Sequence, residues 1–334
     1  MKNILLILVG VFFFSFASEK VEYNHVCSNT WGFFGHKRIN RIAVFTLPTE
    51  MFTFYKHHIE FLTENAVNPD KRRYAVEGEA ERHYIDIDRY NKYGDPFEVV
   101  PRKWKDAVEK FGDSTLKANG TIPWHLEVMM NRLTKAFIDK DAERILRLSA
   151  DLGHYVGDAH VPLHTTENYN GQLTGQKGIH GFWESRIPEL FMDDDYDLFV
   201  GKAFYVDSPL DYAWNVVKES HNAVDSVLKF EKQLTIEYGE DKKFSYEQRG
   251  RVTMKVYSAE FSKAYERMLN NMQEKRMRAS ILTTGSFWYT AWVNAGKPNL
   301  NELLGKEDKD KLKQQTQEYD QFFNEGKGKG REHE

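Results

Sequence analysis

Apolar positions recur at helical spacing over most of the chain, and few segments show the alternation that is typical of strands. Over residues 39–47, apolar side chains return every three or four positions until Pro48 ends the segment. The same spacing predicts further helices over 50–65, 124–138, 142–159, 209–236 and 247–297, with long loops at 66–100, 165–181 and 192–208. The pattern therefore predicts an all-α fold, a single mostly helical domain.

The first 17 residues have the pattern of a signal peptide. Lys2 precedes an almost unbroken apolar run that begins at Ile4 and is too short to cross a bilayer comfortably. Ser15 and Ala17 put small residues at the two positions that a signal peptidase recognises, so we expect cleavage after Ala17. A short membrane anchor is the alternative. The protein is therefore expected to be secreted or periplasmic.

The remainder divides into three parts. Residues 18–30 form a leader segment, and residues 31–300 contain no repeat, linker or low-complexity stretch, which predicts one domain. Residues 301–334 are densely charged and end in GKGKGREHE, so we expect a frayed helix followed by a disordered tail.

Charge and cysteine content narrow the chemistry. Lys and Arg number 46 against 50 Asp and Glu, a formal net charge of −4, which excludes a uniformly basic nucleic-acid coat protein but allows a local basic groove. The single cysteine, Cys27, excludes an intramolecular disulfide framework and a metal site of the CxxC type. Any bound metal must therefore be held by His, Asp and Glu.

Polar side chains share one face of the helix predicted over 142–159. His154 and Asp158 are four residues apart and so are neighbours on a helix. Arg147 and Asp151 fall in the same narrow stripe. A helix that is otherwise rich in core residues therefore directs an imidazole and a carboxylate to one place.

Three more candidate ligands follow within a short stretch. Pro162 ends the helix and His164 lies in the turn beyond it, while His180 and Glu184 repeat the four-residue spacing. Each pair alone is compatible with a surface salt bridge or a core contact, but together they favour a metal site. Imidazole and carboxylate suit zinc, which can activate water where a coordination position stays open. His160 is expected to have a structural or supporting role.

Five motifs in order resemble the superfamily that joins the single-strand-specific zinc nucleases and the zinc-dependent phospholipases C. They are Trp31-Gly-Phe-Phe-Gly-His36, Pro69-Asp70-Lys-Arg-Arg73, His83-Tyr-Ile-Asp86, His154-Tyr-Val-Gly-Asp158 with Val-Pro-Leu-His164 after it, and His180-Gly-Phe-Trp-Glu184. By motif the resemblance covers residues 31 to about 190. It implies a largely helical, secreted phosphodiesterase that holds three zinc ions in one cleft.

The resemblance also implies a role for each matching residue. The zinc ligands would be Asp70, His83, His154 and Asp158 for the first ion, His164, His180 and Glu184 for the second, and the Trp31 backbone, His36 and the bridging Asp158 for the third. Asp70 would also orient or deprotonate the attacking water, and Arg73 would pair with a phosphate oxygen. Without the resemblance, Asp70 and Arg73 would be interpreted as a salt bridge in a loop.

The N-terminus departs from the family's pattern. In the family the first Trp is the mature N-terminus and its amine is a zinc ligand, whereas cleavage after Ala17 leaves residues 18–30 ahead of Trp31. Three possibilities stay open. A second cleavage exposes Trp31, the Trp31 carbonyl and His36 hold the third ion alone, or the third ion binds weakly.

Features that resemble the nucleases predict an endonuclease that cuts single-stranded DNA or RNA and leaves 5′-phosphates. Tyr84 would stack on a base, with Asp86 near the base edge. Trp183 and the cationic stretch 71–73 favour the same substrate, although Tyr84 and Trp183 are equally compatible with core packing.

Two alternatives stay open. Glu184 stands where nucleases usually carry Asp, which favours a phospholipase C acting on phospholipid head groups. The alternative of another class is a non-catalytic protein that binds phosphorylated ligands through its metals. No protein partner is implied by the sequence.

Overall fold

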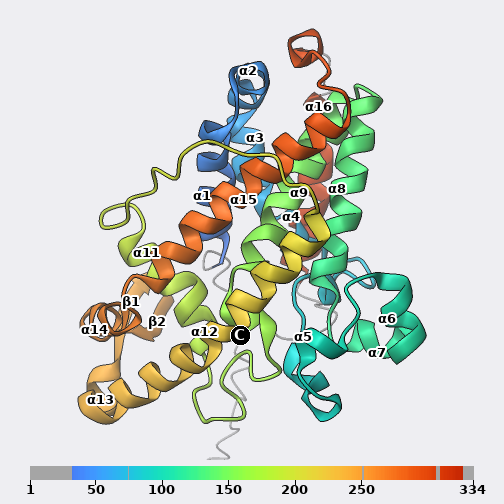
Figure 1. Cartoon of the computed structure of the whole chain (residues 1–334). Coiled ribbons are helices and arrows are strands. Elements are labelled where there is room, and N and C mark those ends of the chain that lie inside the picture. The colour runs from blue at the N-terminus through green and yellow to red at the C-terminus, as the bar shows by residue number, and fades with distance from the viewer. Residues whose placement is uncertain (1–31, 74, 250–251, 306–308, 326–334) are drawn as a thin grey trace, which may run out of the picture.

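Long helices pack side by side into a bundle in the computed structural model, which describes residues 32–73, 75–249, 252–305 and 309–325 (Figure 1). The bundle is made of α1 (Phe33–Ala43), α8 (Ile122–Ile138), α9 (Ala142–Ala159), α12 (Pro209–Tyr238) and α15 (Met272–Asn294). The core lies where α8, α9 and α15 meet, and it buries Leu133, Ile145 and Trp288 completely. The predicted helical, single-domain fold is confirmed.

Shorter elements surround this bundle. The helices are α2 (Thr49–His57), α3 (Ile59–Glu64), α4 (Asn68–Arg72), α5 (Pro96–Val99), α6 (Trp104–Phe111), α7 (Asp113–Ala118), α10 (Ile179–Gly181), α11 (Ile187–Phe191), α13 (Glu240–Lys243), α14 (Ala259–Leu269) and α16 (Lys309–Asn324), and the strands are β1 (Phe244–Arg249) and β2 (Val252–Tyr257). None of the described helices is both long enough and apolar enough to cross a membrane.

The single helix predicted over 247–297 is wrong. Its first part belongs to an antiparallel hairpin of β1 and β2, in which Phe244 lies opposite Tyr257. Aromatic and β-branched residues favour a pleated strand, and Phe182 stacks on Tyr257 with ring centroids 3.7 Å apart, which ties the hairpin to the rest of the molecule. Asn270 and Asn271, both with positive φ, then separate α14 from α15.

Two smaller expectations also need correction. The helix predicted over 50–65 divides into α2 and α3 at His58, whose backbone leaves the helical region. His58 is buried, and its ring packs on that of Phe54. The loop predicted over 66–100 contains α4 and α5.

Glycines of α9 allow α1 to approach closely. A Cβ on Gly153 would lie 1.8 Å from Asn40 Oδ1. Asn40 is fully buried, and its Nδ2 donates hydrogen bonds to the carbonyls of Leu62 (3.1 Å) and Ala150 (3.0 Å). The amide therefore joins three helices at a point where α9 has no room for a side chain.

We predict that Gly153→Ala lowers the free energy of unfolding by about 2 kcal/mol, because the methyl group displaces the Asn40 amide from its two carbonyls. The matched control is Gly181→Ala, since a Cβ there meets nothing within 4 Å. That variant should keep or gain stability, by up to about 1 kcal/mol. Denaturant unfolding measures both, and equal stabilities would contradict the packing described for α1 and α9.

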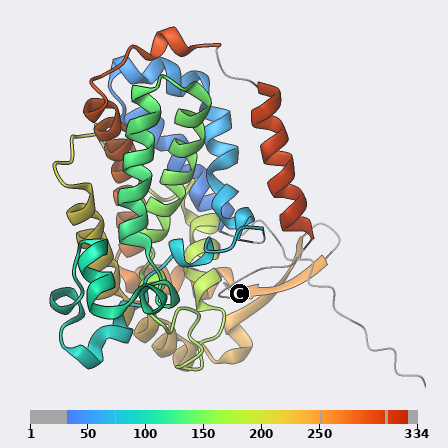
Figure 2. The same cartoon turned by 90° about the vertical axis from the view of Figure 1, so that its right-hand side faces the viewer.

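Helix α16 lies along the side of the bundle and packs on α4 (Figure 2). Lys71 forms an ion pair with Asp320, the Arg72 guanidinium lies over the Tyr319 ring, and Phe33 contacts Phe323. The frayed helix that was expected in this region is thus held against α4 and the start of α1. The expected tail falls on 326–334, and the signal peptide, leader and Trp31 fall on 1–31. Both ranges lie outside the described residues.

Candidate metal centre

The predicted ligands that the structure describes converge in space. Their side chains form three groups, and within each group one ligand atom per residue lies within 4.8 Å of the others: His36, His154 and Asp158; Asp70, His83 and His154; and His164, His180 and Glu184. These residues come from α1, α4, the segment after the 3₁₀ turn Ala80–Arg82, α9, the 3₁₀ turn Pro162–Thr165 and the helical stretch that begins with α10. Helix α9 contributes to two groups and is the central scaffold.

Local structure explains how each ligand is placed. On α9, His154 and Asp158 are neighbours because a helix brings i and i+4 side chains together. A π-helical turn, Phe182–Arg186, carries Glu184 and follows α10; such turns occur frequently at functional sites. Gly157 makes room for His36, since a Cβ there would lie 2.8 Å from its Nδ1. The His36 ring therefore stacks on His154, with centroids 4.0 Å apart.

The separations among the predicted ligands of the first ion, which are Asp70, His83, His154 and Asp158, fit a tetrahedral zinc site. His83 Nδ1 lies 2.9 Å from Asp158 Oδ2 and 3.1 Å from His154 Nε2, and His154 Nε2 lies 3.2 Å from Asp158 Oδ2. Asp70 Oδ1 lies 3.6 Å from each of the two imidazole nitrogens. Zinc bonds of roughly 2.0–2.1 Å at tetrahedral angles separate neighbouring ligands by about 3.3 Å. The donor set of nitrogen and oxygen atoms and its spacing both suit this metal.

Backbone carbonyls fix the orientation of three of the histidines. The Nδ1 atoms of His154, His164 and His180 face the carbonyls of Ala66, His83 and Tyr169. A carbonyl only accepts, so Nδ1 carries the proton and a neutral ring presents the Nε2 lone pair to the centre. In His180 that nitrogen lies 2.7 Å from Glu184 Oε2, a separation that either a proton on Nε2 or a bound cation satisfies.

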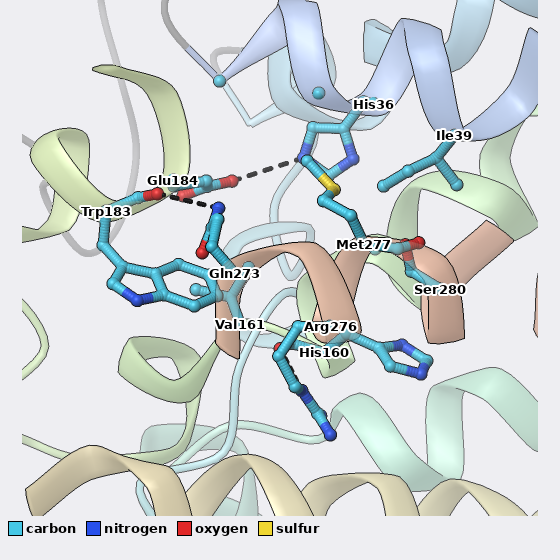
Figure 3. Close-up of a pocket in the computed structure, with 13 residues that line it drawn as sticks. His36, Ile39, His160, Val161, Trp183, Glu184, Gln273, Arg276, Met277 and Ser280 are labelled. Carbon is cyan, nitrogen blue, oxygen red and sulfur yellow. Dashed lines mark hydrogen bonds and ion pairs between the residues drawn. The ribbon is translucent and has the colours of Figure 1, made fainter. Parts of the chain in front are cut away.

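Two carboxylates connect the groups. Asp158 Oδ1 lies 3.3 Å from His36 Nε2, while its Oδ2 lies 2.9 Å from His83 Nδ1, among the predicted ligands of the first ion. Glu184 Oε2 faces His180 and His164, while its Oε1 lies 3.4 Å from His36 Nε2 (Figure 3). The resemblance assigned Glu184 to the second ion alone. The structure adds a contact between Glu184 and His36, a predicted ligand of the third ion.

The electrostatics of the centre favour positive charge. Burial opposes charge on His36, but hydrogen bonds to Asp158 and Glu184 outweigh it and raise the pKa of His36 to about 10. Burial likewise disfavours the Glu184 carboxylate, yet His164, His180 and His36 hold its pKa well below the ordinary value. A buried cluster of carboxylates that draws a proton onto imidazole is one that also binds a metal cation.

The remaining predicted residues lie around this centre. Asp70 has the most exposed side chain of the ligand carboxylates, at 24%. Arg73 is largely buried and lies near enough to His83 for its charge to oppose protonation of that ring. Tyr84 and Asp86 are also buried, with 7% and 6% exposed, which leaves little surface for a base to contact. Their substrate-binding roles stay predictions.

The cationic stretch 71–73 differs from the expectation in its secondary structure and in the pairing of its charges. It lies on and just after helix α4 rather than in a loop. Lys71 is paired with Asp320, and Arg72 with Asp151 and Glu79, so two of its charges are already neutralised. Trp183 is buried among Val161, Leu163 and other apolar residues, in agreement with the packing alternative.

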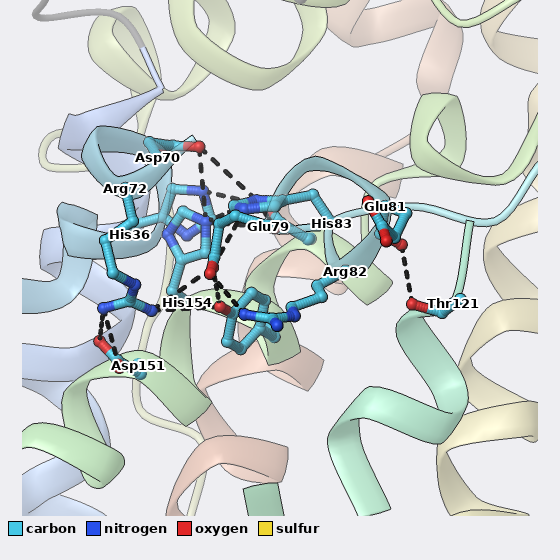
Figure 4. A network of polar contacts seen from close by, with 12 residues as sticks. His36, Asp70, Arg72, Glu79, Glu81, Arg82, His83, Thr121, Asp151 and His154 are labelled. Carbon is cyan, nitrogen blue, oxygen red and sulfur yellow. Dashed lines mark hydrogen bonds and ion pairs between the residues drawn. The ribbon is translucent and has the colours of Figure 1, made fainter. Parts of the chain in front are cut away.

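Glu79 is a residue that the sequence analysis missed. Its carboxylate is 1% exposed and lies 3.8 Å from His83 Nε2, on the side of the ring opposite the ligand atoms (Figure 4). Tyr155, Arg82 and Arg72 all contact the Glu79 carboxylate. The network thereby supports the orientation of His83. The available signal was again a four-residue spacing, Glu79 to His83, in a segment that was expected to be a loop.

The neighbouring His125 predicts a pH effect on stability. Its ring packs on Tyr155, and burial together with the Arg82 guanidinium lowers the pKa of His125 from the ordinary 6.5 to about 3. Between these values the unfolded chain binds a proton that the folded chain excludes, so stability is complete above pH 6.5 and falls as the pH drops. The expected loss near pH 5 is about 2 kcal/mol.

The measurement compares denaturant unfolding near pH 8 and pH 5 for the wild type and for His125→Asn, which cannot titrate. Both proteins keep the same metal ligands, so release of zinc in acid cancels in the comparison. The variant should lose about 2 kcal/mol less than the wild type on acidification. Identical losses would mean that His125 takes up its proton as readily in the folded chain.

A helical bundle that gathers three groups of histidine and carboxylate side chains able to hold metal ions is typical of a metal-dependent hydrolase. The family model described as S1/P1 Nuclease matches residues 31–280, and the chain belongs to this family. The match confirms the resemblance drawn from the five motifs and extends beyond it. No curated protein matches the chain. The family supports a zinc-dependent nuclease or phosphodiesterase that acts on nucleic acid.

Proposed function

We propose that this protein is a secreted or periplasmic endonuclease that hydrolyses single-stranded DNA or RNA with three zinc ions and leaves 5′-phosphate ends. The observation that supports this most directly is the convergence of the three ligand groups, linked through Asp158 and Glu184. The group of His164, His180 and Glu184 offers three protein ligands and so leaves one position of a tetrahedral zinc open, which suits a catalytic site, whereas a closed structural site would use four. This favours an enzyme over a non-catalytic protein that binds phosphorylated ligands.

In this proposal the ligands are divided as the resemblance implies. Asp70, His83, His154 and Asp158 hold the first ion, His164, His180 and Glu184 the second, and His36, Asp158 and the Trp31 backbone the third. Trp31 becomes a complete ligand only if the leader is removed, so a second cleavage before Trp31 belongs to the proposal. Export through the signal peptide over residues 1–17 precedes it.

The chain's own residues would divide the chemistry as follows. Bound zinc supplies Lewis acidity that activates water and offsets the charge of a phosphodiester. The exposed edge of the Asp70 carboxylate orients the attacking water and accepts its proton. Arg73 lies near His83, and its guanidinium pairs with a phosphate oxygen, a contact that suits the planar guanidinium.

Base recognition is the least constrained part of the proposal. Tyr84 would stack on a base only if its buried ring becomes accessible when the strand binds. Phospholipid is the second candidate substrate, because Glu184 is the residue that phospholipases C carry at this position. A parallel assay separates the two possibilities.

The assay presents the zinc-loaded protein with single-stranded DNA and with phosphatidylcholine vesicles, each with and without a chelator. We expect chelator-sensitive release of 5′-phosphorylated fragments from DNA and no diacylglycerol from the vesicles. Diacylglycerol release with intact DNA would replace the nuclease by the phospholipase. Binding of either substrate without turnover would favour the non-catalytic alternative.

A further inference from the structure

A polar cavity lies beside the metal centre, and the proposed reaction does not use it. It has a volume of about 200 Å³, which is room for several water molecules. Its walls come from α3, α4, α8, α9 and α16, with Asn65 from the turn that precedes α4. Four arginines line it against one carboxylate: Arg72, Arg132, Arg144, Arg147 and Asp151.

The charges in this arginine cavity do not cancel. Arg72 is balanced by Asp151 and Glu79, and Arg144 by Asp139 and Asp141. Within the described part of the chain, Arg132 and Arg147 have no carboxylate within 4 Å of their guanidinium groups. The buried Nε of Arg147 lacks a hydrogen-bond acceptor there as well. Two guanidinium groups without a carboxylate partner therefore line the same cavity: that of the exposed Arg132 and that of the half-buried Arg147, whose Nε is buried and unsatisfied. This arrangement favours the entry of an anion.

The cavity lies close to the metal centre but is separated from it by the Arg72 network. Arg147 precedes His154 by two helical turns on the same stripe of α9, a rise of about 10 Å. Arg72 fills the space between, with its guanidinium fixed by Asp151 and Tyr155. The face of α9 that carries the candidate metal ligands thus continues into the arginine cavity. The candidate ligands suit cations, whereas the arginines of the cavity suit anions.

Helix α16 forms the outer wall of the arginine cavity, so an anion bound there would contact this helix. Thr316 and Tyr319 of α16 line the cavity, and Thr316 donates a hydrogen bond to Asn65 Oδ1 (2.7 Å). Tyr319 also lies over Arg72. An anion held between α8, α9 and α16 would join the C-terminal helix to the helices that carry the metal ligands.

We propose that this cavity binds a phosphate group, as inorganic phosphate or as the phosphate of a nucleoside monophosphate, at a site separate from the metal centre. Guanidinium groups bind phosphate by paired, charge-assisted hydrogen bonds, which suits Arg132 and Arg147. The amide nitrogens of Asn65 and Asn68 each donate one hydrogen bond within the protein and keep a second hydrogen that a phosphate oxygen can accept. Occupation stabilises α16 on α4. The inference rests on the cavity alone and does not depend on the proposed nuclease activity.

Equilibrium dialysis of the zinc-loaded, full-length protein against labelled inorganic phosphate tests the proposal. The double variant Arg132→Ala/Arg147→Ala should lose one bound phosphate per chain, or bind it at least tenfold more weakly. The control Arg102→Ala/Arg278→Ala removes the same charge from the exposed Arg102 and the partly exposed Arg278, neither of which lines the cavity, and should bind as the wild type does. Equal binding by all three proteins would overturn the proposal.

Two further measurements make the test independent of folding defects and of the metal centre. Hydrogen exchange of residues 309–325 should slow on adding phosphate to the wild type but not to the double variant, and no change in the wild type would count against the site. Hydrolysis at saturating substrate should be the same in both proteins. Repeating the dialysis with a nucleoside 5′-monophosphate distinguishes the sources: equal affinity indicates recognition of phosphate alone, and tighter binding that the double variant loses indicates the nucleotide.

Discussion

Asp158→Asn is expected to reduce hydrolysis by more than about 100-fold, the upper limit found for residues that only support a metal ligand. Asparagine keeps the shape of the side chain but removes its charge and one acceptor oxygen. Because Oδ1 and Oδ2 of Asp158 face different ligand groups, the substitution weakens two metal positions together. Zinc per chain should therefore fall along with kcat/KM, as measured by elemental analysis and by the DNA assay.

The control for this variant is Asp193→Asn. Asp193 is an exposed carboxylate paired with Arg38, away from the ligand groups, and its loss should change neither zinc content nor activity. If Asp158→Asn kept both its zinc and its activity, Asp158 could not bridge two groups. The assignment of the first and third positions would then fail.

Glu79→Gln is expected to weaken zinc binding by 10- to 100-fold, the range found when a carboxylate behind a metal-bound histidine is removed. The neutral amide no longer supports the imidazole of His83 from its Nε2 side, 3.8 Å away. It also leaves Arg72 and Arg82 with one fewer carboxylate. Competition with a chelator of known affinity gives the change in zinc binding directly.

Glu81→Gln is the matched control, because Glu81 contributes its backbone carbonyl, rather than its carboxylate, to the bond from Thr121. Circular dichroism establishes that both variants are folded at the assay temperature. Weaker zinc binding in Glu79→Gln alone would support the positioning role. Equal zinc affinity in the two variants would mean that Glu79 serves the Arg72 and Tyr155 contacts and does not position His83.

Where local spacing decides it, the sequence predicted which candidate ligands lie together, and their binding of metal stays a prediction. His154 with Asp158, and His180 with Glu184, are pairs four residues apart, and His164 follows a proline that ends α9. The helices α8 and α9 were also predicted nearly to their ends, because their apolar positions repeat regularly. Such features are encoded within a few residues of one another.

Features that depend on distant partners were not predictable in this way. Lys71 and Arg72 were interpreted as a cationic surface, but their partners Asp320 and Asp151 lie far along the chain. The need for glycine at position 153 arises from Asn40 on another helix. The sequence analysis did not predict the hairpin of β1 and β2. Its strands are short, and the hydrogen-bonded pairing between them, rather than a hydrophobic pattern, defines them.

The most direct test of the account measures hydrolysis of single-stranded DNA by the zinc-loaded protein while a chelator removes zinc stepwise and added zinc restores it. We predict that activity falls as zinc leaves, returns on re-addition of zinc, and yields fragments with 5′-phosphates. Cleavage that continues unchanged after the zinc has been removed would contradict a catalytic role for the three ligand groups.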